Sequence, residues 1–375
     1  MKRAMWLFIL TFSVFTQAKQ SDPNLILVTI DGVRWQEVFY GLDNQLVSDK
    51  ESTSDPKALK TLFQGHNAQQ SREKLMPFLW QYVVENGVIL GDRKQNSTMR
   101  VSNPWYFSYP GYNEVITGIA DPNIDSNDKN PNPNISFLEW LQSQPSFEPN
   151  LAVFGSWDVF PAIFNRERSK LHINAGFEIA KHTTNPKLQF LNELQEQVPS
   201  PWSSVRLDAF TYQYAKAYLQ TQKPRVMMLA LGEPDDYAHG GNYDEYIKGI
   251  HRADKILADL WQTLQAIPQY KNNTYLLITT DHGRGMDRED WRHHSSKAAI
   301  EKNYPSILEK QPEGIVGSEQ VWFAAIGPKI KAKGLVIPKQ EQTLSQVTAT
   351  ALQLLGQNPS TFNPKIAPPL EGIAQ

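Results

Sequence analysis

Residues 274–283 read TYLLITTDHG, and this stretch decides the fold class of the chain. Its first seven residues are mostly apolar or β-branched, and a polar Asp-His pair follows them directly. A short run of this kind is typical of a strand buried inside a parallel sheet. Four further runs have the same form, and each ends in a polar residue or a glycine: 25–30, 150–154, 225–231 and 321–326.

Segments with helical periodicity lie between these runs. The clearest are 75–85, 136–143, 208–221, 243–267 and 344–355. Strands that alternate with helices predict an α/β fold with a doubly wound sheet flanked by helices. Ligands of such sheets bind outside the carboxyl ends of the strands. The polar residues that end each run are therefore the candidates for chemistry.

Two stretches do not follow this alternation. Residues 42–69 are polar and interrupted by turn-forming residues. Residues 120–134, ADPNIDSNDKNPNPN, are dense in Asn, Asp and Pro. We expect both to be loop insertions over the active-site face rather than linkers between domains. The sequence shows no internal repeat, so a single domain over residues 19–375 is the simplest organisation.

Residues 1–18 read MKRAMWLFILTFSVFTQA and have the three parts of a secretory signal peptide. A positive start precedes twelve mostly apolar residues, and Thr16-Gln17-Ala18 resembles a small-x-small cleavage site. The apolar run is short for a membrane span, although an uncleaved anchor is the alternative. No later stretch suggests stable membrane insertion. The segment predicts export, to the periplasm or outside the cell.

The composition excludes several classes of chemistry. The 375 residues include no cysteine, which rules out disulfides, thiolate metal sites, iron–sulfur clusters and cysteine nucleophiles. Any transition metal must therefore bind His, carboxylate or hydroxyl groups. The net charge of −2 provides no basic footprint for a nucleic-acid polymer.

Three short motifs place metal-ligand side chains after predicted strands. Asp31 follows the run 25–30, although an Asp there could also cap a helix. Asp235 and His239 are four residues apart, which places them on one face of a helical turn; a surface histidine is the alternative. Asp281 and His282 end the run 274–280, where an acidic surface loop is the alternative. Carboxylate oxygen and imidazole nitrogen together suit zinc.

A fourth motif contains a candidate nucleophile. Residues 107–118 read FSYPGYNEVITG, in which Ser108 precedes Pro110 and could begin a helix. At a helix N-terminus its oxygen would meet free N–H groups and the positive end of the helix dipole. This place suits a nucleophile that receives a phosphoryl group. The alternative is an ordinary N-cap serine.

The order Asp, Ser, Asp-x3-His, Asp-His, His resembles the alkaline phosphatase superfamily. More closely, it is similar to the branch of nucleotide pyrophosphatase/phosphodiesterases and cofactor-independent phosphoglycerate mutases. The resemblance spans residues 24–356 and implies an alkaline-phosphatase-like sheet. The matching residues are Ser108-Tyr109-Pro110, Thr117-Gly118, Glu233-Pro234-Asp235 with His239, Thr280-Asp281-His282-Gly283, Trp291 with His294, Gly317-Ser318 to Trp322, and Gly327-Pro328.

The resemblance implies two divalent metal ions, with zinc in first place and manganese or magnesium as alternatives. It assigns one ion to Asp235, His239 and His294. It assigns the other to Asp31, Asp281 and His282, with Ser108 contacting that ion as nucleophile. His293 competes with His294 for the same ligand position, and the Trp-x-x-His spacing favours His294.

The resemblance also implies residues that contact a small phosphorylated substrate. Asn127 is the best match for a phosphate-binding asparagine, and Asn130, Asn132 and Asn134 lie close to it in the same loop. Arg284 could contact the phosphate or cap a helix. Three aromatic residues could stack on a substrate ring or simply belong to the core: Trp157, Phe160 and Phe164.

The function that follows is an exported two-metal phosphate-ester hydrolase that forms a phosphoserine intermediate. Ser108 stands where the diesterases have Thr, so both phosphatase and phosphodiesterase activity stay open. The sulfatase signature Cys/Ser-x-Pro-x-Arg is absent after Ser108. One alternative is a phospho-group transferase or mutase-like enzyme of the cell envelope. The other is a non-catalytic metal- or glycan-binding protein on the same fold.

Overall fold

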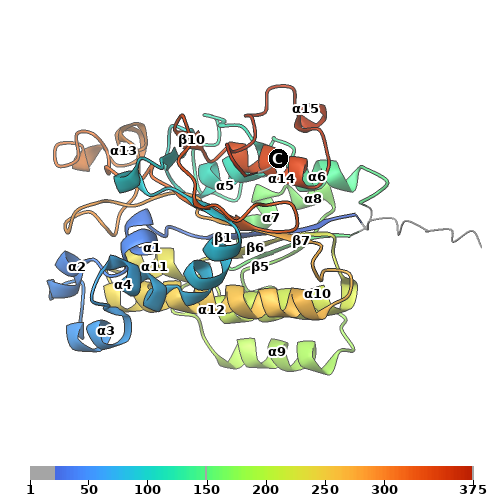
Figure 1. Cartoon of the computed structure of the whole chain (residues 1–375), viewed down its shortest axis with the longest axis horizontal. Helices are drawn as coiled ribbons and strands as arrows, with labels where there is room; N and C mark the ends of the chain where they lie inside the picture. Colours follow the sequence, from blue (N-terminus) through green and yellow to red (C-terminus); the bar gives the residue numbers. More distant parts are fainter. Residues whose placement is uncertain (1–21, 148–149, 374–375) are drawn as a thin grey trace, which may run out of the picture.

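The computed structural model describes residues 22–147 and 150–373, and a large central sheet runs through it (Figure 1). The predicted signal peptide at 1–18 lies outside the described residues. The eight strands follow the order β5-β4-β6-β1-β7-β8-β2-β9. Their bounds are β1 Asn24–Ile30, β2 Val88–Leu90, β4 Leu151–Gly155, β5 His172–Ala175, β6 Val226–Leu231, β7 Thr274–Thr279, β8 Phe323–Ile326 and β9 Gly334–Leu335. A separate short pair joins β3 (Met99–Arg100) to β10 (Gln342–Thr343).

All five strands that the sequence predicts are present, and four of them run parallel. Strands β4, β6, β1 and β7 pair parallel to one another, and β5 extends this set. Strand β8 runs antiparallel to both β7 and β2. The chain leaves β7 at its carboxyl end. After residues 280–322 it re-enters the sheet at the same end, where Phe323 pairs with Thr279. Without a crossover helix to return it to the other end, β8 must run in the opposite direction.

Helices cover both faces of the sheet, as a doubly wound fold requires (Figure 1). One face carries α10 (Asp208–Gln222) and α12 (Tyr243–Ala266), and the other carries α5 (Ser108–Thr117) and α14 (Gln346–Leu354). The other helices are α1 Trp35–Tyr40, α2 Asn44–Ser48, α3 Pro56–Phe63, α4 Ala68–Leu75, α6 Phe137–Gln142, α7 Phe160–Ile163, α8 Arg166–Ser169, α9 Pro186–Gln197, α11 Glu233–His239, α13 Lys297–Asn303 and α15 Pro359–Phe362, with short helices η1 Leu79–Val84, η2 Arg93–Gln95 and η3 Pro305–Ile307. The predicted fold class is confirmed.

Strand β1 lies in the middle of the sheet and contributes to both hydrophobic cores. Ile26, Val28 and Ile30 belong to the cluster on the α12 face. Leu25 and Leu27 belong to the cluster on the α5 face. Successive side chains of a strand point to opposite faces, so a continuous apolar run is what a strand covered on both sides requires.

Four of the predicted helices correspond to observed ones, namely 136–143, 208–221, 243–267 and 344–355 with α6, α10, α12 and α14. The fifth predicted helix, 75–85, is present with a displaced start, because residues 77–86 are continuously helical around the π-helical turn η1. Leu75 instead ends α4, and Met76 separates the two helices. Pro77 explains this boundary, because the residue before a proline is driven out of the α-helical region.

The prediction of a loop over residues 42–69 is wrong, because three helices begin there. Asp43, Asp55 and Asn67 each accept a backbone N–H bond at the N-terminus of α2, α3 and α4. The polar residues that suggested a loop are therefore N-caps. Residues 120–134 contain no helix or strand, as predicted. Within residues 22–147 and 150–373, no helix combines the length and apolar character that crossing a membrane would need.

We expect Leu27→Ala to lower the free energy of unfolding by about 2–5 kcal/mol, because it leaves a cavity in a closed core. Leu27 is fully buried and lies opposite Met228 and Leu277 in the sheet. The matched control is Leu62→Ala, since Leu62 is 54% exposed and should change stability by less than about 0.5 kcal/mol. Urea unfolding measures both. Equal losses would mean that β1 is not the centre of the core.

Candidate metal centre

The candidate ligands gather at the carboxyl ends of three neighbouring strands. Asp31 follows β1, Asp235 lies in the first turn of α11 just after β6, and Asp281 and His282 follow β7. The backbone N–H of Asp31 donates to the carbonyl of Leu231 at 2.9 Å, which joins the ends of β1 and β6. Parallel strands present their carboxyl ends at one edge of the sheet, and ligands bind there.

The first group of potential ligands consists of Asp31, Asp281 and His282, whose ligand atoms lie within 4.8 Å of one another. The Nε2 atom of His282 is 3.4 Å from Oδ1 of Asp31 and 3.5 Å from Oδ2 of Asp281. Its Nδ1 atom lies 2.8 Å from the carbonyl of Gly283. A proton on Nδ1 therefore leaves the Nε2 lone pair facing the carboxylates, as metal-ligating histidines require.

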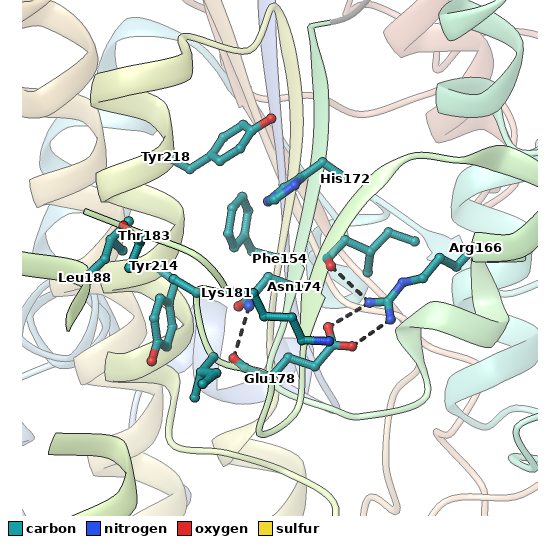
Figure 2. A pocket seen from close by; sticks show the side chains of 13 residues that line it. Phe154, Arg166, His172, Asn174, Glu178, Lys181, Thr183, Leu188, Tyr214 and Tyr218 are labelled. Atoms are coloured by element: carbon teal, nitrogen blue, oxygen red, sulfur yellow. Dashed lines mark hydrogen bonds and ion pairs between the residues drawn. The ribbon is translucent and has the colours of Figure 1, made fainter. Parts of the chain in front are cut away.

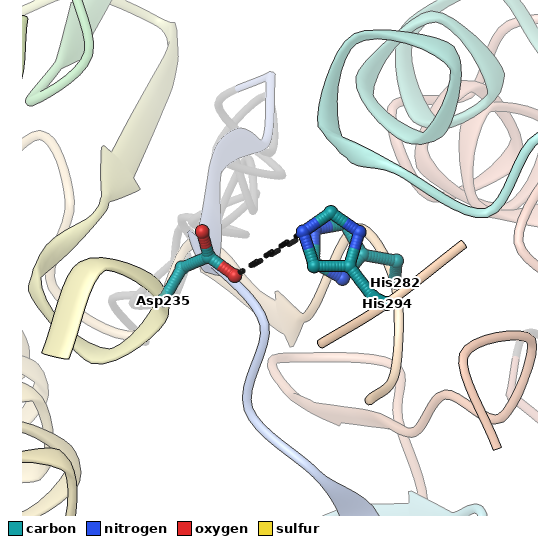
Figure 3. Close-up of side chains that lie close together, drawn as sticks. All are labelled: Asp235, His282 and His294. Carbon is teal, nitrogen blue, oxygen red and sulfur yellow. Dashed lines mark ion pairs between the residues drawn. The ribbon is translucent and has the colours of Figure 1, made fainter. Parts of the chain in front are cut away.

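The second group consists of Asp235, His282 and His294 (Figure 3). The Oδ1 atom of Asp235 is 3.9 Å from Nε2 of both histidines. The rings of His282 and His294 stack, with centroids 3.8 Å apart. His239 was predicted in this group, and it lies at the rim. Its Nε2 atom is 3.0 Å from that of His294 and 3.2 Å from Oδ2 of Asp235. The two predicted ligand sets thus form one continuous cluster.

The cluster contains polar atoms that fit a divalent cation. Oδ1 of Asp31 and Oδ2 of Asp281 are buried and have no hydrogen-bond partner. An unpaired buried carboxylate oxygen is costly, and coordination to a metal removes that cost. The donors are carboxylate oxygens and imidazole nitrogens, which suit zinc and accept manganese. The residues present therefore fit a metal site.

Burial and mutual repulsion shift the acidities in the cluster. Burial together with the charge of Asp235 raises the pKa of Asp31, and burial together with Asp31 raises the pKa of Asp281 well above its usual range. Burial opposes protonation of His282, yet the neighbouring aspartates raise its pKa to about 9. Burial and the neighbouring His282 hold the pKa of His294 well below its usual range. These shifts show a surplus of buried negative charge that a cation would offset.

Arg284 pairs with Asp235, and its whole side chain is buried. Burial alone would raise the pKa of Asp235, but His239 and Arg284 hold it well below its usual range. The guanidinium also donates to the carbonyls of Trp291 and Arg292. These contacts hold Asp235 and the segment before His294. None of these contacts is a helix cap, and a contact of Arg284 with a substrate phosphate stays a prediction.

Ser108 is the first residue of α5, and its hydroxyl points at the cluster. Its Oγ atom lies 3.2 Å from Nε2 of His282. The N-cap residue is Phe107, so the alternative of an N-cap serine does not hold. Gly111 permits this placement, because a Cβ atom there would collide with the backbone carbonyl of Asp281. Helix α5 can therefore approach the end of β7 closely enough to bring Ser108 to the ligands.

Of the asparagines in the 120–134 loop, Asn127 lies beside Ser108. Its Oδ1 atom accepts the backbone N–H of Tyr109 at 3.0 Å. Asn132 and Asn134 instead donate to Oδ1 of Asn113, and Asn130 contributes its carbonyl to the hydroxyl of Tyr109. Among the three aromatic candidates, Phe160 and Phe164 are buried in the core and Trp157 is half-buried.

The sequence reading missed Tyr112, whose hydroxyl donates to Oδ2 of Asp31 at 2.9 Å. Tyr112 lies four residues after Ser108 on α5, so both side chains face the same way. This spacing was visible in the sequence and could have identified it.

A pocket of about 380 Å³ lies elsewhere, beside the edge strand β5 (Figure 2). Phe154, Tyr214 and Tyr218 line it, and Arg166 forms an ion pair with Glu178 across its rim. Arg166 also donates to the carbonyl of Ile173. None of the predicted site residues lines this pocket.

We expect His294→Ala to lower the zinc content of the purified chain, because His294 faces Asp235 and His239 inside the cluster. His293→Ala is the matched control, since the neighbouring His293 lies outside both ligand groups and should keep the parent content. Elemental analysis after dialysis, with chelator competition, measures both. Equal zinc binding by the two variants would reject His294 as a ligand.

Comparison with known proteins agrees with this geometry. Residues 178–359 match the family model of the metalloenzyme superfamily. No curated protein matches the chain. Among solved structures, alkaline phosphatase PafA has a TM-score of 0.56 at 9% identity, over 95% of this chain and 100% of its own.

Two further structures have the same fold. Ps i-CgsB, solved with k-i-k-neocarrahexaose, has a TM-score of 0.52 at 14% identity, over 93% of this chain and 75% of its own. The lipoteichoic acid synthase LtaP from Listeria monocytogenes has a TM-score of 0.51 at 12% identity, over 90% of this chain and 72% of its own. At these identities the likeness shows the fold alone. The narrower resemblance to the diesterase and mutase branch stays a prediction. With the metalloenzyme superfamily model matching residues 178–359 and an alkaline-phosphatase-like fold across the chain, the predicted resemblance to the alkaline phosphatase superfamily is confirmed.

Proposed function

We propose that the protein is an exported phosphate-ester hydrolase, a phosphatase or phosphodiesterase, that forms a phosphoserine at Ser108. The observation that carries this proposal is the place of Ser108, which heads α5 with its hydroxyl 3.2 Å from His282 in a cluster of buried and partly buried metal-ligand residues. The signal-peptide pattern of residues 1–18 supports export. Zinc is the first candidate metal, and manganese or magnesium are the alternatives.

The chemistry has two displacements at phosphorus. In the first, the Ser108 oxygen bonds to phosphorus, the ester oxygen leaves as an alcohol, and the serine proton is transferred to it. In the second, water attacks phosphorus, and the released product is phosphate from a monoester substrate or a phosphate monoester from a diester. One proton of the water restores the serine hydroxyl. When bound, two divalent cations would lower the pKa of the attacking hydroxyl and offset charge on the phosphoryl oxygens.

Residues around Ser108 are placed to receive the phosphoryl group. The positive end of the α5 dipole lies at Ser108 and would favour an anion there. Asn127 uses its amide oxygen to accept the N–H of Tyr109. Its NH₂ group is therefore the part that would donate to a phosphoryl oxygen, and we assign Asn127 a substrate-binding role.

Sulfate esters are the main competing substrate class, because a solved 2-O GAG sulfatase, BT1596, shares the fold with a TM-score of 0.51 at 16% identity. In the sulfatase signature Arg stands four residues after the nucleophile. Here Tyr112 occupies that position, and its hydroxyl is bonded to Asp31. The departure leaves Ser108 as a plain hydroxyl nucleophile and favours phosphate esters.

Two other functions remain as outcomes of the test. A phospho-group transferase or mutase-like enzyme of the cell envelope would use the same Ser108 but pass the group to an alcohol acceptor. A non-catalytic metal- or glycan-binding protein would keep the ligands and turn over nothing.

We expect Ser108→Ala to lower phosphate-ester turnover by roughly 10³-fold or more, because the nucleophile is lost. Ser108→Thr should retain measurable turnover, since it keeps a hydroxyl. The matched control is Ser136→Ala, which removes the N-cap of α6 away from the cluster and should cost about 1 kcal/mol of stability without loss of turnover. The assay measures hydrolysis of three nitrophenyl substrates by the metal-loaded protein: a phosphate monoester, a phosphate diester and a sulfate ester.

Each contrary result points to a different function. Turnover of the sulfate ester alone would replace phosphate by sulfate chemistry. Product that appears only when an alcohol acceptor is added would identify a transferase. Full activity in Ser108→Ala would reject the nucleophile, and metal binding without any turnover would favour a binding protein.

A further inference from the structure

We propose that the left-handed backbone at Tyr106, held by Asn103 and Glu114, is a positioning device that ties the metal ligand His294 to the nucleophile segment. The inference rests on the part of the proposed function that assigns His294 to a metal. It assigns a role to three residues that neither the sequence motifs nor the reaction accounts for.

Glu114 is the anchor of this device. It is fully buried on α5, and its carboxylate accepts hydrogen bonds from five donors. These donors are the backbone N–H groups of Ser102, Asn103 and Ser345, the hydroxyl of Ser102 and the side-chain amide of Asn103. A carboxylate with both oxygens satisfied by backbone N–H groups holds a loop in one conformation. Glu114 therefore fixes residues 102–103 against the helix that carries Ser108.

Asn103 transmits this anchor along the loop. Its side-chain oxygen accepts the backbone N–H groups of Trp105 and Tyr106, each at 3.0 Å. Tyr106 has φ of +61°, in the left-handed region that bulky side chains rarely occupy. Such a conformation costs on the order of 1–3 kcal/mol and persists only where the surroundings impose it. Here the hydrogen bonds that Asn103 and Glu114 accept impose the left-handed conformation of Tyr106.

The consequence of this conformation is the direction of two successive carbonyl groups. The carbonyl of Tyr106 lies 3.1 Å from Nδ1 of His294, and the carbonyl of Trp105 accepts the N–H of Ser296 at 3.0 Å. With its proton on Nδ1, His294 directs Nε2 at His239, 3.0 Å away, and toward Asp235. The Tyr106 carbonyl thus selects both the tautomer and the ring orientation that metal binding requires.

The same loop reaches Ser108 two residues later. The segment 102–108 therefore fixes the position of the metal ligand His294 relative to the nucleophile Ser108, although the two residues are far apart in sequence. Partners that orient a ligating histidine typically contribute 10–100-fold to metal affinity. The hydroxyl of Tyr106 has a separate contact, from the Arg100 guanidinium at 3.0 Å, so side chain and backbone can be tested apart.

The first test compares three substitutions of Tyr106 in the full chain. Asn and Gly adopt positive φ readily, whereas the β-branched Val does not. All three remove the ring and the hydroxyl, so they differ in the backbone they permit. We expect Tyr106→Asn and Tyr106→Gly to bind zinc within about threefold of the parent. Tyr106→Val should bind about 10–100-fold more weakly, with an altered visible spectrum of the cobalt-loaded protein. Equal affinity in all three variants would overturn the proposal.

The second test uses Glu114→Gln, with Asp254→Asn as its matched control. Asp254 is also a buried carboxylate that accepts two backbone N–H groups, those of Phe78 and Leu79, but it lies on α12. Both variants should lose stability in urea unfolding, because an amide cannot accept from all the same donors. Only Glu114→Gln should weaken zinc binding. Equal weakening in both would reduce Glu114 to a general packing role and reject the device.

Both tests measure zinc by chelator competition rather than by turnover, which separates this inference from the proposed function. A parent that binds zinc but cleaves no ester would reject the hydrolase, while the ranking of the variants would still decide the device.

Discussion

The repulsion among three aspartates at one edge of the sheet, two buried and one partly buried, is the interaction on which the rest of the site depends. Asp31, Asp235 and Asp281 sit at the ends of β1, β6 and β7 because parallel strands place their carboxyl ends together. Burial and mutual charge then make the site costly without a cation. Arg284 offsets part of this charge at Asp235, while one oxygen each of Asp31 and Asp281 has no hydrogen-bond partner. The fold thus carries a site that is incomplete without positive charge.

The same edge of the sheet explains why this site can carry a nucleophile. Helix α5 brings Ser108 close because Gly111 leaves no side chain between the helix and the end of β7. The segment before α5 then reaches across to His294 through the carbonyl of Tyr106. Ligand and nucleophile are therefore held by one buried carboxylate, Glu114, and by hydrogen bonds to the backbone rather than by a disulfide. This arrangement suits a chain without cysteine.

The sequence predicts the parts of this molecule that depend on short-range patterns. Continuous apolar runs identify five strands, and the Asp-x3-His spacing correctly places Asp235 and His239 on one helix. Strand β5 was not predicted, because two of its four residues, His172–Ala175, are polar and the strand lies at the sheet edge. The burial of Arg284 against Asp235 and the turn at Tyr106 were not predictable, because they depend on partners 49 and 188 residues away and on a backbone angle that composition does not reveal.

The edge strand β5 has a consequence for how copies of this chain behave together. Arg166 donates to the carbonyl of Ile173, so a guanidinium group occupies an acceptor that an incoming strand would use. Exposed strand edges template sheet growth between molecules, and charged groups along an edge oppose it. Arg166 therefore opposes cross-β association at this outermost strand when the protein is concentrated.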